Sequence, residues 1–190
     1  ARIPETKRAD MYCWVREQID RGIQACVVCP AIEAEDPAAA GDEAPPAAVE
    51  AHLAYLRHQP ALRDLPMTGL HGRMASREKR QIFESFRNGE LAVLVATTVI
   101  EVGVEAPGAG IMIIEDAWRF GLSQLHQLRG RVGRTGRQDY CFLMGTPPND
   151  QARARLEILC RCTDGFALAE EDLRLRGPGD LLGVRQTGGM

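Results

Sequence analysis

Several features that would assign the chain to a common functional class are missing from its 190 residues. No apolar run approaches the roughly 18 residues that cross a bilayer, and there is no secretory leader, so we expect a cytoplasmic protein without membrane segments. There is no G-x-x-x-x-G-K-[ST] phosphate loop and no acidic metal-binding strand end, so the chain should not bind or hydrolyse ATP well by itself. Because it opens at Ala1 without an initiator Met, we expect a piece of a longer polypeptide.

Lys and Arg are absent from residues 31–56, which contain six acids. Taking this charge of −6 from the net charge of −3 leaves about +3 for the rest of the chain. We interpret the acidic tract as a solvated loop without a ligand, while the remainder could still meet an anionic partner locally.

The six cysteines form no pattern that is typical of a metal site. Cys26 and Cys29 form a C-x-x-C within ACVVCP, which has the apolar composition of a buried strand. Residues three apart on a strand point to opposite faces and would not share a metal. We therefore predict buried reduced thiols, and no metal ligands in the chain.

Apolar runs indicate an α/β fold. Four runs lack polar alternation, as strands buried on both faces do, and a fifth is weaker: residues 25–29, 91–96, 111–114, 141–144 and, more weakly, 67–70. Helical stripes lie between them. One contains Met11, Trp14 and Val15, and another, with Ser76 as its expected N-cap and Gly89 at its end, contains Ile82, Phe83 and Phe86. Alternating helices and buried strands predict a parallel sheet flanked by helices.

Two composition changes divide the chain. Residues 33–48 are rich in Ala, Pro and acids, which predicts a mobile insertion after the first strand. After Pro147 and Pro148 we predict a helix capped by Asp150 through about Cys162, with Leu156 and Leu159 inward, then a second helix over 167–175. We therefore expect one lobe over 1–147 and a helical hairpin with a terminal loop over 148–190.

A row of arginines stands at residues 124–137, QLHQLRGRVGRTGR. Arg131 and Arg134 are three apart, so on a helical turn they project from one face. Guanidinium groups are permanently charged and fork onto phosphate oxygens, which suits an arginine finger that completes a nucleotide site from the opposite side. The alternative is a flexible Gly/Arg segment that touches nucleic acid loosely.

Five ordered elements resemble superfamily 2 helicases. ATTVIEVGVEAP (96–107) and QLHQLRGRVGR resemble motifs V and VI, CVVCP resembles motif IV, and LHGRM (70–74) resembles the strand-end element that follows it. The tail, DGFALAEEDLRLRGPGDLLGVRQTG (164–188), resembles the translocation motif shared by RecG-type branched-DNA helicases and transcription-repair coupling translocases. The combination is most similar to the RecG type, and it implies a second RecA-like motor lobe.

The resemblance implies a nucleotide site shared with a preceding lobe that would hold most of the ATP and Mg²⁺. Arg131 and Arg134 match the arginines that reach the γ-phosphate, and Gln127 matches the leading polar residue of that motif. Gly103 and Glu105 match the end of motif V, where an acid usually faces the ribose. Many RecG-type sequences have Asp at position 105, so the longer side chain shifts the reach of this contact. Glu105 could instead be a solvated loop acid.

The resemblance also implies a DNA surface and a coupling element. Thr97 and Thr98 match positions that usually meet DNA phosphates or relay contact to them, although their hydroxyls could merely cap the next turn. Gly72 and Arg73 fall where the family approaches the DNA backbone, and Arg73 could instead pair with a surface carboxylate. Arg176 and Gln186 match polar positions of the translocation loop. We interpret His71, His126, Trp14 and Trp118 as structural.

The function that this resemblance implies is the second motor lobe of an ATP-dependent DNA helicase that remodels forks and Holliday junctions in repair and recombination. Its expected partners are branched DNA, the preceding lobe and a wedge domain of the same polypeptide. Two alternatives stay open: the corresponding lobe of a transcription-repair coupling translocase, and a non-catalytic helicase-like docking module. The chain alone is expected to be inactive.

Overall fold

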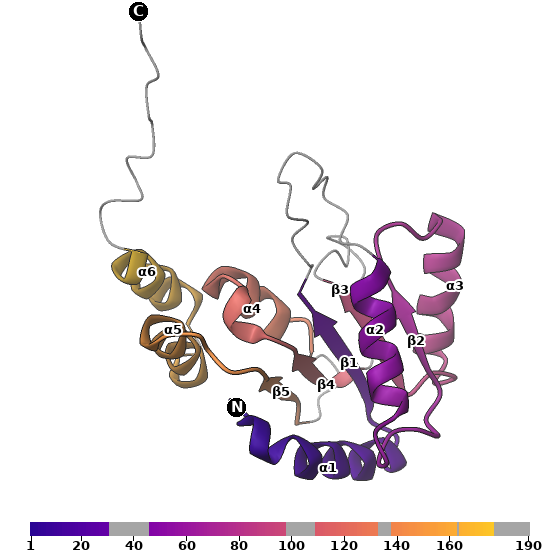
Figure 1. The fold of residues 1–190 in the computed structure, drawn as a ribbon. Helices are drawn as coiled ribbons and strands as arrows, with labels where there is room; N and C mark the ends of the chain where they lie inside the picture. Colours follow the sequence, from indigo (N-terminus) through magenta and orange to yellow (C-terminus); the bar gives the residue numbers. More distant parts are fainter. Residues whose placement is uncertain (31–45, 98–108, 133–137, 163, 177–190) are drawn as a thin grey trace, which may run out of the picture.

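The computed structural model describes residues 1–30, 46–97, 109–132, 138–162 and 164–176 (Figure 1). Its centre is a five-stranded sheet with the spatial order β2-β3-β1-β4-β5, in which every pairing is parallel. The strands are β1 (Gln24–Cys29), β2 (Met67–Leu70), β3 (Val93–Thr97), β4 (Ala109–Ile114) and β5 (Tyr140–Leu143). All five predicted strands and the parallel sheet are confirmed.

Alternate residues of the strands enter two hydrophobic cores, one on each face of the sheet. Val27 and Cys29 face a core covered by α1 (Arg8–Asp20) and α2 (Pro46–Arg57). Cys26 and Val28 face the core formed with α3 (Ser76–Arg87) and α4 (Leu122–Arg129). The two thiols of the C-x-x-C therefore lie on opposite faces, as predicted, and burial raises the pKa of the Cys26 thiol to about 12.

Two predicted helix caps are wrong by one residue. Ser76 is the first residue of α3, because Ala75 has the extended backbone of the N-cap and contributes no side-chain hydrogen bond. At α5 (Asp150–Arg161) the cap is Asn149, whose side chain accepts a hydrogen bond from Ala152 N at 2.8 Å. Gly89 does follow the end of α3, where its φ of +79° favours glycine.

Helix α2 is absent from the sequence prediction. It begins at Pro46, a residue that suits the first helical position because its missing N–H would have no partner there. Its buried face consists of Val49, Leu53 and Leu56, which pack on β1, β2 and β3. The predicted insertion over 33–48 therefore overlaps a helix at its end, and residues 31–45 lie outside the described residues.

The last two helices, α5 and α6 (Gly165–Arg176), form the predicted hairpin and pack on α4. Leu156 and Leu159 of α5 and Leu168 of α6 are buried in the same core as the α4 leucines. The hairpin is thus continuous with the α4 side of the sheet rather than separate from it (Figure 1). Within the described residues, no helix is long and apolar enough to span a bilayer.

Both tryptophans belong to the packing of the fold, as predicted. Trp14 meets Tyr140 and Phe142 edge-on, with ring centroids 4.7 and 5.4 Å apart, and so joins α1 to β5. Trp118 is half-buried against the core on the α4 side. At the same edge of the sheet, Ile3 N donates to Leu143 O at 3.0 Å, which places the first residues of the chain beside β5.

Candidate nucleotide-sensing and coupling site

Helix α4 carries the arginine-rich segment, and three leucines fix its orientation. Leu122, Leu125 and Leu128 are buried at helical spacing, so Gln127 is left on the exposed side. The helix begins after Gly121, whose N–H donates to Gln124 Oε1 at 3.0 Å. The leucines therefore hold the polar face of α4 in one direction, with the arginines at its end.

Arg131 continues the last turn of α4, since its N–H donates to Leu128 O at 3.1 Å. Its side chain is half-buried, and its positive charge opposes part of the rise that burial causes in the pKa of Cys26. No carboxylate among the described residues forms an ion pair with it. Arg134 lies outside the described residues, so the shared face of the two arginines stays a prediction.

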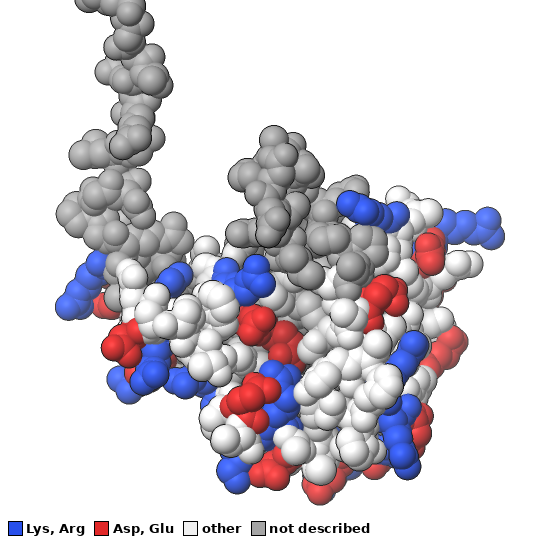
Figure 2. Space-filling view, viewed as in Figure 1, with Lys and Arg blue, Asp and Glu red and all other residues white. Residues whose placement is uncertain are grey.

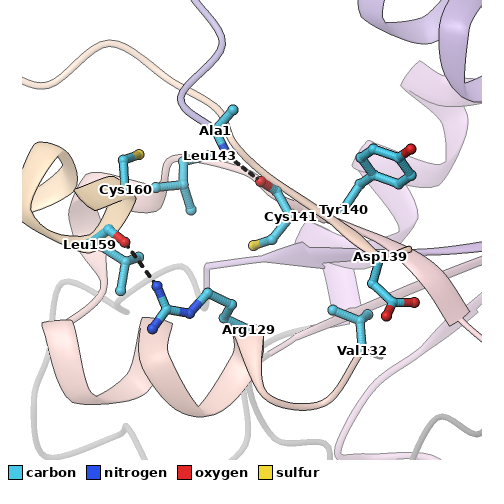
Figure 3. A pocket seen from close by; sticks show the side chains of 9 residues that line it. All are labelled: Ala1, Arg129, Val132, Asp139, Tyr140, Cys141, Leu143, Leu159 and Cys160. Atoms are coloured by element: carbon cyan, nitrogen blue, oxygen red, sulfur yellow. Dashed lines mark hydrogen bonds between the residues drawn. The ribbon is translucent and has the colours of Figure 1, made fainter. Parts of the chain in front are cut away.

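Arg129 is the residue of this segment that sequence reasoning left without a role. Its guanidinium donates to Leu159 O at 2.9 Å (Figure 3) and to Cys162 O at 2.8 Å, at the end of α5. The last carbonyls of a helix have no partner within it, and a cation is favourable there. Arg129 thus joins the end of α4 to the end of α5, two residues before Arg131 in the chain.

His126 completes this joint with the second helix of the hairpin. Its Nδ1 lies 2.9 Å from Arg129 Nη2, and a Cβ added at Gly165 would lie 2.9 Å from its Nε2. A side chain at position 165 would therefore require the imidazole to shift. The structural role predicted for His126 is confirmed. We refer to Arg129, His126, Gly165 and the carbonyls of Leu159 and Cys162 as the α4–hairpin joint.

A cavity of about 290 Å³ lies beside the joint, between the end of α4, β5 and α5 (Figure 3). Arg129 and Leu159 line it together with Cys141 and Cys160. Burial raises the pKa of the Cys141 thiol to about 11, so this thiol stays protonated near neutral pH. Cys141 therefore does not supply a reactive thiolate to this cavity.

The predicted DNA-contacting residues that the structure describes follow two neighbouring strands. Thr97 ends β3, and Gly72 and Arg73 follow β2, which runs parallel to β3. Carboxyl ends of parallel strands share one edge of a sheet, so the structure brings these residues to a common edge. Arg73 is exposed, whereas Thr97 is 1% exposed and its hydroxyl has no hydrogen-bond partner among the described residues. Their contact with DNA stays a prediction.

The remaining predicted site residues fall either outside the described residues or at the end of α6. Thr98, Gly103, Glu105 and Gln186 lie outside the described residues. Arg176 is the last residue of α6. Their assigned roles therefore stay predictions.

Charges of both signs are interspersed over the surface. The described part of the face in Figure 2 shows Lys and Arg next to Asp and Glu, without one broad basic field. A large cationic surface would bind any nucleic acid through phosphate charge alone. On this face, the described charges therefore favour nucleic-acid contacts made by a few individual residues rather than by one broad basic surface.

Comparison with known proteins follows the motifs. Residues 14–136 match the family described as helicase conserved C-terminal domain. The chain is 48% identical over 188 residues to the ATP-dependent DNA helicase RecG of Escherichia coli O157:H7, and 45% identical over 186 residues to that of Synechocystis sp.. Both alignments cover 98% of this chain, but only 26% and 22% of the relatives, so the chain spans about a quarter of their length.

Among solved structures, RecG bound to a three-way DNA junction is similar to the chain with a TM-score of 0.74 and 38% identity. This match covers 95% of this chain and 22% of that one. The DUF1998 helicase MrfA shares the fold, with a TM-score of 0.58 at 17% identity over 82% of this chain and 20% of that one. The resemblance to RecG-type helicases and the RecA-like parallel sheet are thus confirmed. The chain belongs to the helicase conserved C-terminal domain family.

Proposed function

We propose that the chain is the second motor lobe of a RecG-like ATP-dependent DNA translocase that remodels stalled forks and Holliday junctions in repair and recombination. The observation that carries the proposal is the α4–hairpin joint. It ties the element that would sense ATP to the element that would move DNA. Relatives named ATP-dependent DNA helicase RecG, and a solved RecG bound to a three-way junction, support DNA as the partner.

On the nucleotide side, the preceding lobe of the same polypeptide would hold ATP and Mg²⁺. Arg131, at the end of a helix held by three buried leucines, would meet the γ-phosphate, and Arg134 with it. A permanent charge aimed from a fixed helix stabilises the charge that develops during phosphoryl transfer. Gln127, Gly103 and Glu105 would line the same cleft.

On the DNA side, Gly72, Arg73 and Thr98 would follow the sugar–phosphate backbone, and the buried Thr97 would relay contact to it. The common sheet edge of the three that the structure describes supports this assignment. Backbone contacts carry no sequence information, which suits a motor that passes over any sequence.

Coupling would run through the hairpin and the loop after it, residues 148–190, attached to the lobe of residues 1–147. If Arg131 moved across the cleft toward a bound nucleotide, α4 would move with it, and Arg129 would carry the end of α5. Arg176 and Gln186 would transmit this displacement to the duplex. Release of phosphate would let the lobes open, and repetition would give a step along DNA. A separate wedge domain would select branched DNA.

The test uses the complete polypeptide of a length like that of the relatives. We expect Arg131→Ala and Arg134→Ala each to lower kcat of the DNA-stimulated ATPase by about 10³-fold or more, because each removes a charge that acts on the transferred phosphate. Affinity for a three-way junction should change no more than a few-fold. Turnover near that of the wild type in both variants would contradict the assignment.

A further inference from the structure

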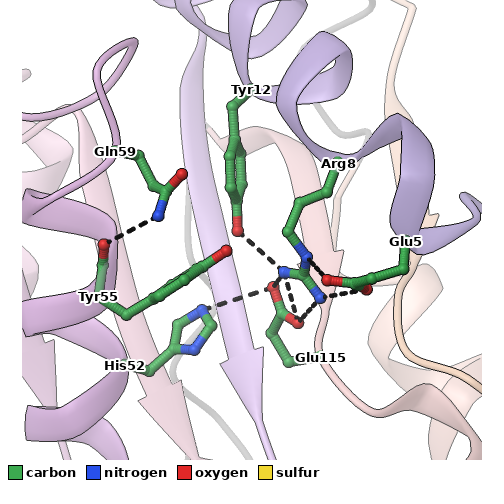
Figure 4. Close-up of polar contacts among 7 residues, drawn as sticks. All are labelled: Glu5, Arg8, Tyr12, His52, Tyr55, Gln59 and Glu115. Atoms are coloured by element: carbon green, nitrogen blue, oxygen red, sulfur yellow. Dashed lines mark hydrogen bonds and ion pairs between the residues drawn. The ribbon is translucent and has the colours of Figure 1, made fainter.

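A buried charge cluster lies on the side of the sheet opposite the α4–hairpin joint, and the proposed function uses none of its residues. Its centre is Glu115, 6% exposed, which directly follows β4. Arg8, on α1, donates from Nη1 to both carboxylate oxygens of Glu115 at 2.8 and 2.9 Å, and from Nη2 to Oε2 at 3.0 Å (Figure 4). The two residues are 107 positions apart in the sequence.

Three other groups surround this ion pair. Glu5 accepts hydrogen bonds from Nε and Nη2 of Arg8, and the Tyr12 hydroxyl lies 3.0 Å from Arg8 Nη1. His52, on α2, places Nε2 3.5 Å from Glu115 Oε1, which is too long for a well-formed hydrogen bond. Burial raises the pKa of the Glu115 carboxyl, but the contacts with His52 and Arg8 outweigh this effect, and the pKa is lowered. Glu115 is thus a buried carboxylate held in its charged form.

The backbone at Glu115 begins the turn that leads into α4. Glu115 N donates to Val28 O at 2.9 Å, and Ala117 N donates to Met144 O at 3.0 Å, so the turn is attached to the ends of β1 and β5. Between these two bonds, Asp116 has φ 43°, a left-handed conformation that costs free energy in any residue with a Cβ. Such a backbone persists only where its surroundings hold it, and the side chain of Glu115 is one of those attachments.

We propose that Glu115 and Arg8 are positioning residues for the ATPase reaction, because their ion pair fixes the turn from which α4 starts and so, together with the three buried leucines of α4, the place of Arg131. This inference rests on the proposed function. Residues 115–121, which include the short 3-10 helix η2 (Ala117–Arg119), separate β4 from α4, so we expect a displaced turn to shift the start of α4. A displacement of about 1 Å at a catalytic group costs on the order of 100-fold in rate, so a small rotation of α4 would suffice.

A double variant separates positioning from stability. Removing one partner leaves a buried charge unpaired, whereas replacing both partners with neutral residues of similar size leaves no unpaired charge and should cost less stability than either single change. In the complete polypeptide, Arg8→Met and Glu115→Gln alone should each lower Tm. The Arg8→Met/Glu115→Gln variant should recover Tm but keep faster hydrogen–deuterium exchange in residues 116–132. Its kcat for DNA-stimulated ATPase should stay at least ~10-fold below that of the wild type, with KM for ATP within about 3-fold.

The matched control is a second ion pair made by α1. Arg16 Nη1 lies 2.5 Å from Asp64 Oδ1, so the pair again joins an arginine of α1 to a carboxylate, but both side chains are more exposed than those of Arg8 and Glu115. The Arg16→Met/Asp64→Asn variant should leave exchange of residues 116–132 and kcat as in the wild type.

The inference is overturned if the Arg8→Met/Glu115→Gln variant recovers Tm, exchange and kcat together, because the pair then acts through stability alone. It is equally overturned if exchange rises but kcat stays at the wild-type value. Should the double variant remain less stable, Arg8→Lys gives the same comparison, since it keeps the charge but loses the forked contact. Normal exchange and kcat in Arg8→Lys, at unchanged Tm, would again overturn it.

A wild-type polypeptide without DNA-stimulated ATPase would contradict the proposed function instead. The exchange of residues 116–132 would still show whether the pair fixes the turn. The two failures are therefore distinguishable.

Discussion

On each side of the sheet an arginine joins two elements of the fold, but the two arginines bind different kinds of acceptor. On the α1/α2 side, Arg8 forks onto the buried carboxylate of Glu115. On the α4 side, Arg129 donates to the backbone carbonyls of Leu159 and Cys162. A buried charged pair is costly to separate, because each charge loses its main partner at a place where little water can replace it. Bonds to the last carbonyls of a helix can be replaced by water when the helix end is exposed.

This difference suggests a division of labour within the lobe. The Arg8–Glu115 pair suits a fixed reference, and the α4–hairpin joint suits a contact that changes its partners during a cycle of opening and closing. Helix α4 connects them in the sequence: it begins seven residues after Glu115, at Leu122, and its last residue is Arg129. The predictions below test this comparison, from the largest expected effect to the smallest.

The largest effect should come from Arg129→Ala in the complete polypeptide. Without the guanidinium, displacement of α4 no longer carries the end of α5, so ATP turnover should persist while junction unwinding per ATP falls by about 10-fold to 100-fold. Parallel assays of ATPase and junction unwinding measure this ratio. For Arg129→Lys, the unwinding per ATP should lie between the values of the wild type and Arg129→Ala, because an ammonium lacks the planar fork that reaches two carbonyls.

The control is Arg161→Ala, at the last residue of α5. Its side chain is 83% exposed and pairs only loosely with Glu157, at 4.0 Å, so both activities should match the wild type. Equal loss of ATPase and unwinding in Arg129→Ala would show that Arg129 belongs to the nucleotide site or to stability, and the joint would lose its proposed role.

A smaller effect is expected from Gly165→Ala. The added Cβ would lie 2.9 Å from His126 Nε2, so the imidazole must shift and disturb its contact with Arg129. Unwinding per ATP should fall by roughly 2-fold to 10-fold, with Tm little changed because alanine suits a helix better than glycine. The same coupled assays measure it. In the background of His126→Ala, the Gly165→Ala substitution should have no further effect; an additive loss would show that the steric contact is not the cause.

The smallest effect concerns the Arg8–Glu115 pair and is a change in the stability of the fold with pH. The lowered pKa of Glu115 means that the pair stabilises the fold fully above the ordinary pKa of a glutamate. That stabilisation is lost as the pH falls through the lower pKa of the folded state. Unfolding of the 190-residue chain followed from pH 7 to pH 3 should therefore show a steeper acid loss in the wild type than in Arg8→Met/Glu115→Gln. Parallel curves would indicate that the carboxylate has the same pKa in the folded and unfolded chains.

Much of the fold was readable from the sequence because its signals are local. The strands are uninterrupted apolar runs, and the α3 face repeats Phe83 and Phe86 at helical spacing before a glycine with positive φ. Helix α2 was not predicted, because an acidic Pro/Ala tract precedes it and because we interpreted Pro46 as part of a loop. The two wrong caps, at Ser76 and Asp150, each fell on the first helical residue, where the same residue types are also favourable.

The attachments of α4 could not be predicted, for two physical reasons. Arg129 binds backbone carbonyls, which every residue has, so no side-chain type marks Leu159 or Cys162 as its partners. Arg8 and Glu115 have complementary charges, but 107 positions separate them and many other pairings were open. Arg131 was identified only because its motif is recognisable, and the structure adds the half-buried position at the end of α4.

The most direct measurement of the central claim is a structure of the complete polypeptide bound to a three-way junction and a transition-state analogue of ATP. We predict that the Arg131 guanidinium contacts the group that replaces the terminal phosphate, with α4 still joined to the hairpin by Arg129. An Arg131 side chain directed into solvent in that complex, away from the nucleotide, would contradict the account.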